Sequence, residues 1–444
     1  MAPEPETTAK RAELPMRLTR LRVKNFRSIA DIDIPLSPLT VLVGPNGSGK
    51  SNVVDALRFV RDVFARGLDQ AVMDREGMGV IQRWGTEGEG ITIGIDLETK
   101  LPEVKPNDEI SFISDEPNAI YSIGYEFKIN SSINFAFVSH ELIRIDSKGH
   151  PLMIKVEQNK FTIEYRGQAQ KNISGKHSFN SPNPLGPARI FEEIEDYTFS
   201  NENSIIDSPT ENQELWFGLG LASYRLSREL TKLLFYTLNI PDLRQPQQLL
   251  KETPFDEEGR NLAAVLRRFI NSEISGKGSL LFALRSAVSG FYDLDVEKVG
   301  GYLATKLIYQ SDTEAPRASY LAQESDGTIR MLGLLAALLQ KPSQPFISIE
   351  EPEANIHPGA LAVLAGVIDE ASLCSQILVT THSPDMLDHL PVESFLVVEK
   401  IGDTTHVGPL DASQIASVRK RLFTPGELFR MEGLQRQTEP ESAS

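Results

Sequence analysis

The chain has 444 residues, enough for two or three domains or for one large domain with insertions. Its composition, 40% hydrophobic and 24% charged, is ordinary for a globular protein and provides ample material for a core. The formal net charge of −16 disfavours a broad nucleic-acid coat, which needs a basic surface, but leaves room for a local basic groove. Cys374 is the single cysteine, which excludes an internal disulfide and a cysteine zinc cluster.

Both ends of the chain are polar, and we expect flexible tails at residues 1–16 and 436–444. The first tail lacks the apolar core of a signal peptide. No apolar run approaches the roughly 18–20 residues of a membrane span. We therefore expect a cytoplasmic protein that has no membrane partner.

The first segments predict strands followed by a helix. Residues 17–35 alternate polar and apolar side chains, which predicts a strand pair near a sheet edge. Residues 39–43, LTVLV, are continuously apolar, which is typical of a strand covered on both faces. After Lys50 the apolar residues recur at helical spacing, and Gly67 is expected to end this helix.

The middle of the chain changes character three times. Residues 91–166 alternate again between turn residues, which predicts antiparallel strands. Residues 168–213 are rich in Asn, Ser and Pro, which predicts a long loop or a mobile insertion. Residues 215–288 have helical spacing, and two short strands are expected near 294–299 and 307–310.

The last third alternates helices and strands, as expected where a parallel α/β sheet is completed. The segments that carry this pattern are TIRMLGLLAALLQ, PFISIE, GALAVLAGVIDEA, QILVTT and SFLVVEK. The fold class predicted from these elements is α/β.

The segment GPNGSGKS matches the phosphate-loop pattern G-x-x-x-x-G-K-[ST] between a predicted strand and a predicted helix. Its glycines allow backbone N–H groups to converge on a phosphate, and the helix adds its positive end. Lys50 is expected to reach the β- and γ-phosphates, and the Ser51 hydroxyl to bind Mg²⁺. The alternative is a Gly-rich turn without a ligand. The nucleotide-binding residues predicted here are Gly44, Pro45, Asn46, Gly47, Ser48, Gly49, Lys50, Ser51 and Asn52.

The segment FISIEEPEANIHPG places two carboxylates, Glu350 and Glu351, at the end of a buried strand. Unpaired burial of such groups is costly, and a metal ion with an activated water would explain them. Glu350 is then the Mg²⁺ ligand, and Glu351 polarises the attacking water. The alternative is a strand that leads two acids into solvent.

The segment QILVTTHSPDML ends a predicted strand at His382. Ligands bind at the carboxyl edge of open α/β sheets, so this imidazole is a candidate partner for a γ-phosphate. The alternative makes His382 incidental, with Ser383 as N-cap and Pro384 at the first helical position.

The segment ESDGTIRML opens a helix with a Ser-Asp-Gly turn, whose free N–H groups suit an anion. Turns of this composition are common, so the segment gains meaning from its position. It precedes the two-glutamate strand by one helix.

The order of these motifs is that of ATP-binding-cassette ATPases. The stretches NFRSI, GPNGSGKSN, SDGT, EEPEANIHP and THSP resemble the predicted ATPases of the SMC, RecF and OLD group, and weaker likeness extends across residues 17–435. The resemblance implies an ABC-ATPase head, which is a P-loop NTPase, with an antiparallel β subdomain and a helical insertion. The expected division is a first half of the head at 17–167, a loop-rich and helical insertion at 168–320, and a second half of the head at 321–435.

The resemblance also implies that two subunits enclose two ATP molecules. Ser325 and Gly327 would bind the γ-phosphate held by the other subunit. Arg27 resembles a basic residue that contacts the nucleotide, and His357 stands where the cassette D-loop has Asp. Gln82 is a candidate for the glutamine loop.

Two positions depart from the cassette pattern. The signature is ESDGT rather than Leu-Ser-Gly-Gly-Gln, and the first acid after the strand is Glu350 rather than Asp. These departures leave the rate of ATP turnover open.

The residues and the resemblance together predict an ATPase that dimerises around ATP and Mg²⁺. Only 62 residues follow His382, too few for the nuclease domain of OLD-type relatives. We therefore expect a homodimer or higher oligomer that controls an effector protein, a nuclease or toxin, within a bacterial defence module. The alternatives are a RecF- or SMC-like ATP-gated DNA-binding protein and a non-enzymatic oligomer held together by ATP.

Overall fold

The computed structural model describes residues 16–100, 120–131, 136–147, 150–157, 160–166, 174–180, 226–248, 254–271, 277–310 and 315–437. Most of both expected tails and of the expected loop at 168–213 lies outside these ranges. Within them, no helix combines the length and the apolar character that crossing a membrane requires.

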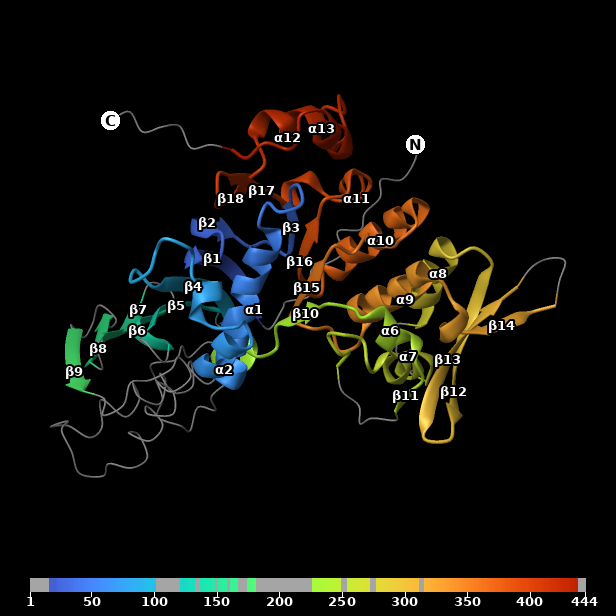
Figure 1. Cartoon of the computed structure of the whole chain (residues 1–444), viewed down its shortest axis with the longest axis horizontal. Helices are drawn as coiled ribbons and strands as arrows, with labels where there is room; N and C mark the ends of the chain where they lie inside the picture. Colours follow the sequence, from blue (N-terminus) through green and yellow to red (C-terminus); the bar gives the residue numbers. More distant parts are fainter. Residues whose placement is uncertain are drawn as a thin grey trace, which may run out of the picture.

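The core of the main sheet consists of parallel strands that come from distant parts of the chain (Figure 1). Strand β3 (Leu39–Val43) lies between β16 (Gln376–Thr381) and β17 (Phe395–Ile401). On its far side β16 pairs with β15 (Phe346–Glu350), which pairs with β10 (Leu234–Tyr236). Because these strands are all parallel, their carboxyl ends meet at one edge, where ligands bind in open α/β sheets.

The predicted helix over residues 215–288 is wrong at β10. Residues 226–230 are helical, but Leu234–Tyr236 pair with β15 as a strand. A short apolar run fits a buried strand as well as a helix, and only the pairing partner decides between them.

The predicted strand pair at 17–35 exists, but it does not lie near a sheet edge. Strands β1 (Met16–Phe26) and β2 (Ile29–Pro35) pair in antiparallel fashion. Strand β18 (Thr404–Pro409) pairs with the free side of β2, and β4 (Ile91–Lys100) with the free side of β1. Alternation of polar and apolar side chains indicates which face of the sheet is buried. It does not indicate whether neighbouring strands pair on both sides, so it cannot tell an edge strand from an inner one.

The expected antiparallel β subdomain extends the main sheet beyond β4, which gives 14 strands among the described residues. Its further strands are β5 (Ile120–Ser131), β6 (Ala136–Ser147), β7 (His150–Glu157), β8 (Lys160–Arg166) and β9 (Ser174–Asn180). Strand β9 falls inside the segment predicted as a loop. Its polar sequence did not predict a strand, but pairing with β8 provides the backbone hydrogen bonds that make it one.

Helices cover both faces of the parallel strands. Helix α1 packs in one core and α9 and α10 pack in the other. The helices with both ends inside the described residues are α1 (Lys50–Arg66), α2 (Leu68–Met73), α3 (Met78–Ile81), α6 (Ile240–Arg244), α7 (Leu262–Asn271), α8 (Lys277–Ala287), α9 (Asp326–Leu339), α10 (Pro358–Ala371), α11 (Pro384–Leu387), α12 (Ala412–Arg419) and α13 (Pro425–Met431). Helix α1 ends before Gly67, as predicted.

Successive side chains of the parallel strands enter two different hydrophobic cores. Leu42 packs in the core that includes the apolar face of α1, whereas Val41 and Val43 pack in the core of α9 and α10. This burial on both faces explains the unbroken apolar run of β3.

A smaller antiparallel sheet stands beside α7 and α8 (Figure 1). Its main hairpin, β12 (Phe291–Val299) and β13 (Tyr302–Tyr309), contains the two short strands predicted from the sequence. Strands β11 (Gln247–Gln248) and β14 (Arg317–Tyr320) flank β13.

Candidate functional site

The loop between β3 and α1 has the backbone of a phosphate cradle. Gly47 and Gly49 have φ values of 76° and 106°, in the left-handed region that side chains disfavour. A Cβ atom on Gly44 would lie 2.1 Å from the carbonyl oxygen of Val398, and one on Gly49 would lie 2.1 Å from Oγ1 of Thr405. The neighbouring strands β17 and β18 therefore leave no room for a side chain at Gly44 and Gly49, whereas Gly47 is favoured only by its φ.

The Lys50 side chain folds back over this loop. Its Nζ donates hydrogen bonds to the carbonyl oxygens of Gly44 at 2.8 Å and Pro45 at 3.0 Å. Burial lowers the pKa of Lys50, while the nearby carboxylates of Glu351, Glu353 and Glu350 act in the opposite direction. The ammonium group thus lies in the electrostatic field of the glutamates after β15.

Polar side chains from β18 and the β1–β2 turn support the loop from behind. Thr405 donates from Oγ1 to the carbonyl oxygen of Ser48 at 2.9 Å and contacts the Ser28 hydroxyl at 2.7 Å. Asn52 donates to the same Ser28 hydroxyl at 2.6 Å. Asn52 was predicted to bind nucleotide, but here its amide braces the start of α1. Thr405 and Ser28 were not singled out from the sequence.

Arg27 lies in the tight turn between β1 and β2, with φ 49°. Its Nε is 2.8 Å from Oδ2 of Asp55 on α1, and Arg75 contacts Oδ1 of the same carboxylate at 2.8 Å. The structure therefore places Arg27 against the phosphate-loop helix, where Asp55 holds its side chain.

The two glutamates predicted from the sequence point in different directions. Glu350 faces α1, and its Oε1 lies 3.5 Å from Nη2 of Arg58. Glu351 leaves the strand with φ 46°, and its N–H donates to the carbonyl oxygen of Thr380 at 3.0 Å. Arg330 of α9 donates to the Glu351 carbonyl oxygen at 2.8 Å, which fixes this turn.

His382 lies beside Glu351, as expected of neighbouring strand ends. Its Nδ1 is 3.2 Å from Oε1 of Glu351 and 3.7 Å from Oε1 of Glu353. Nδ1 is buried and has no hydrogen-bond partner within the described part of the chain, so its contact with Glu351 is close in distance but is not a hydrogen bond.

Glu353 is a site residue that the sequence reasoning missed. It is 9% exposed, and its Oε1 accepts hydrogen bonds from Oγ1 of Thr381 at 2.6 Å and from the N–H of His382 at 3.2 Å. Its position two residues after Glu351, within the same quoted motif, was the available signal.

The donor set at this edge suits Mg²⁺ held partly by a nucleotide. Such sites need one hydroxyl, one carboxylate, phosphate oxygens and water rather than a cage of protein ligands. Ser51 exposes its side chain at the first turn of α1, and Glu350 ends the strand next but one to β3. Among the described residues there is no group of three or more His, Cys, Asp and Glu side chains that would hold a metal alone. These residues fit a nucleotide-bound ion.

The Ser-Asp-Gly turn begins α9, as predicted. Ser325 is its N-cap and accepts a hydrogen bond from the N–H of Thr328 at 3.2 Å. A Cβ atom on Gly327 would lie 2.5 Å from the carbonyl oxygen of Asn355, so this turn packs on the segment after β15. The exposed Ser325 side chain is accessible to a second molecule.

The other two residues considered in the sequence, His357 and Gln82, form hydrogen bonds with nearby parts of the chain. His357 accepts a hydrogen bond through Nδ1 from the N–H of Gly359 and caps α10. Gln82 donates from Nε2 to the carbonyl oxygen of Thr86 at 2.6 Å, within its own loop.

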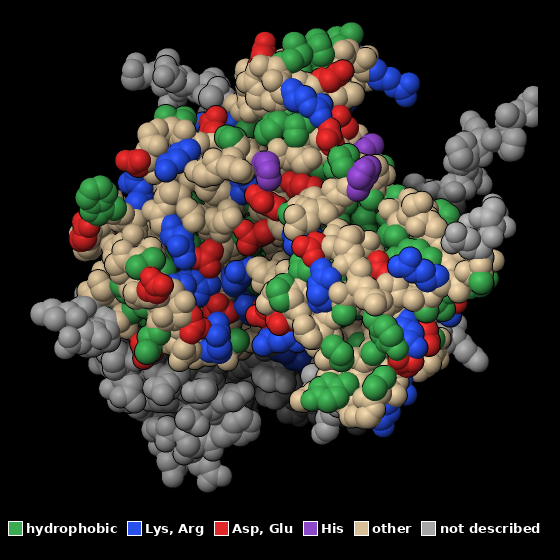
Figure 2. Space-filling view, turned by 45° about the vertical axis from the view of Figure 1, so that its right-hand side comes forward, with side chains coloured by type: hydrophobic (Ala, Val, Ile, Leu, Met, Phe, Trp, Pro, Cys, Tyr) green, Lys and Arg blue, Asp and Glu red, His purple; other side chains and the backbone are tan. Residues whose placement is uncertain are grey.

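Charged side chains gather on part of the molecular surface. Figure 2 shows acidic and basic side chains gathered along the middle of one face, with histidines above them.

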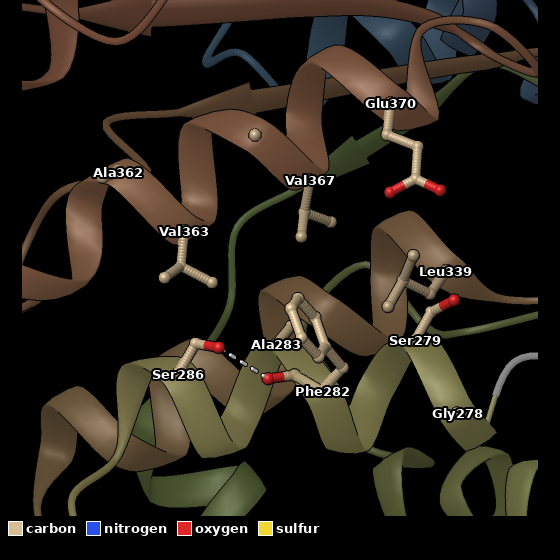
Figure 3. Close-up of a pocket in the computed structure, with 11 residues that line it drawn as sticks. Gly278, Ser279, Phe282, Ala283, Ser286, Leu339, Ala362, Val363, Val367 and Glu370 are labelled. Atoms are coloured by element: carbon tan, nitrogen blue, oxygen red, sulfur yellow. Dashed lines mark hydrogen bonds between the residues drawn. The ribbon is translucent and has the colours of Figure 1, made fainter. Parts of the chain in front are cut away.

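A separate groove of about 570 Å³ lies between α8 and α10 (Figure 3), and Phe282 in this groove is 74% exposed. None of the predicted nucleotide-binding residues lines this groove.

The sequence matches the protein family described as "AAA domain, putative AbiEii toxin, Type IV TA system" over residues 39–388. The OLD nuclease of Thermus scotoductus is 58% identical over 43 residues, which are 10% of this chain and 8% of that protein. The chromosome partition protein Smc of Halothermothrix orenii is 57% identical over 47 residues, which are 10% of this chain and 4% of that protein. The replication and repair protein RecF of Chlorobium phaeobacteroides is 33% identical over 112 residues, which are 24% of this chain and 30% of that protein.

The chain thus matches less than a third of the length of each of these relatives. Solved structures of SMC heads are also similar. One, bound to the C-terminal winged-helix domain of ScpA, is 16% identical, with a TM-score of 0.45 over 89% of this chain and 99% of that chain. Because the family match spans more than half of the sequence, the chain belongs to this AAA-domain family, and its similarities to OLD nuclease, Smc and RecF support the predicted SMC-, RecF- and OLD-like ABC-type ATPase head.

Proposed function

We propose that the chain binds ATP together with Mg²⁺ and hydrolyses it. The observation that carries this proposal is the convergence of Lys50, Glu351 and His382 at the carboxyl edge of the neighbouring strands β3, β15 and β16. A cationic side chain for phosphate, a carboxylate for the attacking water and an imidazole for the γ-phosphate are the groups that hydrolysis needs.

Each residue has a distinct role in this proposal. Lys50 exchanges its two loop carbonyls for phosphate oxygens, and the backbone N–H groups of residues 44–51 surround the same phosphates. Ser51 and Glu350 hold the metal ion, which neutralises phosphate charge when bound. Glu351 accepts a proton from the attacking water, and His382 contacts the γ-phosphate from the adjacent strand end.

The dimer is part of the same proposal. Ser325 and Gly327 open α9 with exposed and half-buried positions, respectively, so they are free to meet the nucleotide of a second copy. Closure of two such heads around ATP, and their release after hydrolysis, changes the shape of the assembly. This change of shape is the output that a partner receives.

Calorimetric titration with ATP tests nucleotide binding directly. Lys50→Ala is expected to abolish binding because the variant loses the phosphate cation. Lys420→Ala removes an exposed lysine of the C-terminal region and serves as the control, with unchanged binding expected. Micromolar binding retained by Lys50→Ala would refute the phosphate-loop assignment.

For the biological role, we propose the ATPase or sensor component of a cytoplasmic bacterial defence module, with a nuclease or toxin supplied by another chain. The family description, which names a toxin and a type IV toxin–antitoxin system, supports this role, as does the similarity to an OLD nuclease. A pull-down from the native host with Glu351→Gln in ATP tests it. A stoichiometric nuclease or toxin is the expected result.

The alternative is an ATP-gated DNA-binding protein of the RecF or SMC kind. The similarity to RecF over 112 residues favours it, whereas the net charge of −16 counts against it. Protected DNA without a partner protein in the same pull-down would favour this alternative and overturn the defence role.

A further inference from the structure

Arg58 stands where α1 passes Glu350, the proposed metal ligand. It follows Ser51 by seven residues, so both side chains lie on one face of the helix, two turns apart. Its Nη2 lies 3.5 Å from Oε1 of Glu350. The two side chains are 26% and 24% exposed, so water screens this charge pair only in part.

This ion pair is loosely built. A strong guanidinium–carboxylate pair has two parallel hydrogen bonds near 2.8 Å, whereas here one long contact is present. The Nε of Arg58 is buried and has no hydrogen-bond partner within the described residues. Arg58 therefore neutralises Glu350 without being locked to it.

The same guanidinium lies over the ring of Phe235 in β10, 5.3 Å from the centroid. Arg61, one turn further along α1, lies 5.1 Å from the same centroid. Glu257 accepts hydrogen bonds at 2.6 Å from both Arg61 and the Phe235 N–H. Phe235 thus joins the phosphate-loop helix to β10 and to the segment around Glu257.

The geometry points to Arg58 as an exchangeable counter-ion of Glu350. Mg²⁺ displaces Arg58 from Glu350, and the displacement couples metal binding to β10. This inference rests on the proposed function for the metal itself. Without metal, a carboxylate at the end of a buried strand needs a positive partner, and Arg58 provides one. With metal, a divalent charge at Glu350 repels the guanidinium, and its shift away from Glu350 changes the cation–π contact that it makes with Phe235 in β10.

The experiment compares the affinity for a non-hydrolysable ATP analogue in Mg²⁺ with the affinity in EDTA, by calorimetry. Arg58→Met removes the competing charge but keeps an extended apolar side chain over Phe235. The gain in affinity due to Mg²⁺ is expected to rise about threefold to fivefold, the worth of one partly exposed ion pair. Arg58→Lys keeps the charge and should stay near the wild-type gain.

Arg61→Met is the matched control, because Arg61 contacts the same ring but pairs with Asp62 and Glu257 instead of Glu350. Its gain due to Mg²⁺ is expected to equal that of the wild type. Hydrogen exchange adds a readout that is independent of turnover. In the wild type Mg²⁺ should alter amide exchange at Leu234–Tyr236, and in Arg58→Met it should not.

A wild-type gain in Arg58→Met, or an equal rise in Arg61→Met, would overturn the inference. Failure of the wild type to bind the analogue in either condition would instead refute the proposed function. Melting temperatures establish that each variant is folded. If Arg58→Met does not fold, Arg58→Gln replaces it with the same expected rise.

Discussion

Oε1 of Glu353 accepts a hydrogen bond from Oγ1 of Thr381 at 2.6 Å, which ties the turn after β15 to the last residue of β16. The same oxygen accepts from the N–H of His382 at 3.2 Å. One buried carboxylate therefore holds the strand end that presents the histidine. The position of His382 depends on this carboxylate as much as on its own strand.

Glu353→Ala is expected to lower the free energy of unfolding by about 1–3 kcal/mol, because it leaves the buried Thr381 hydroxyl and the partly buried His382 N–H without this acceptor. ATP turnover should fall as well, since His382 loses its support. Urea denaturation and a phosphate-release assay measure the two effects. Glu370→Ala, at an exposed position of α10, is the control. Wild-type turnover by Glu353→Ala would contradict the positioning role.

Glu351→Gln is expected to bind ATP normally but to hydrolyse it at least about a hundredfold more slowly, because the amide cannot accept the proton from water. The ATP-bound closed dimer should then persist. Sedimentation in the presence of ATP and a turnover assay test both expectations. Hydrolysis at the wild-type rate would exclude Glu351 as the base.

The glycines of the phosphate loop should differ in their tolerance. Gly44→Ala forces a Cβ atom against the Val398 carbonyl oxygen, a backbone atom that cannot move aside. Gly47→Ala meets no atom within 4 Å and adds only the strain of φ 76°. We expect Gly44→Ala to lose more stability and ATP affinity than Gly47→Ala, as measured by thermal unfolding and calorimetry. The reverse order would contradict this account of the loop.

Glu141 of the β subdomain should make stability depend on pH. Burial raises its pKa from 4.5 to about 8, while a hydrogen bond from the Tyr125 hydroxyl partly opposes the shift. Between these values the unfolded chain has lost a proton that the folded chain keeps. The free energy of unfolding should therefore fall by up to about 1.4 kcal/mol per pH unit across this window and level off above it.

Glu141→Gln should flatten this dependence, because the amide keeps an acceptor for Tyr125 and does not ionise. Urea denaturation from about pH 5 to about pH 9 measures the slope. Glu87→Gln, in an exposed loop, is the control and should keep the wild-type slope. An unchanged slope in Glu141→Gln would show that another group titrates.

The sequence was sufficient for elements whose chemistry is local. The phosphate loop, the helix ending before Gly67 and the strands leading to Glu350 and His382 are encoded in short patterns of glycine, charge and apolar spacing. Within the described residues, the alternating order predicted for the last third of the sequence appears as α9, β15, α10, β16 and β17.

The sequence was insufficient where the decisive partner is remote. Leu234–Tyr236 becomes a strand because β15 offers it hydrogen bonds, and no neighbour in the sequence signals this. The same holds for Thr405, which supports a loop several hundred residues earlier in the chain. Arg58 was passed over because helical spacing accounts for its place on α1 but not for the carboxylate that it meets.

The position of β3 has a consequence for synthesis on the ribosome. This strand leaves the ribosome well before its two neighbours, β16 and β17, which are translated several hundred residues later. Until then Leu39–Val43 is an apolar segment with open edges on both sides, and the phosphate loop lacks Thr405 and Val398 beneath it. A nascent chain therefore lacks the support of this loop until β18 has been made, so the proposed closure of the heads around ATP would have to follow the synthesis of β18.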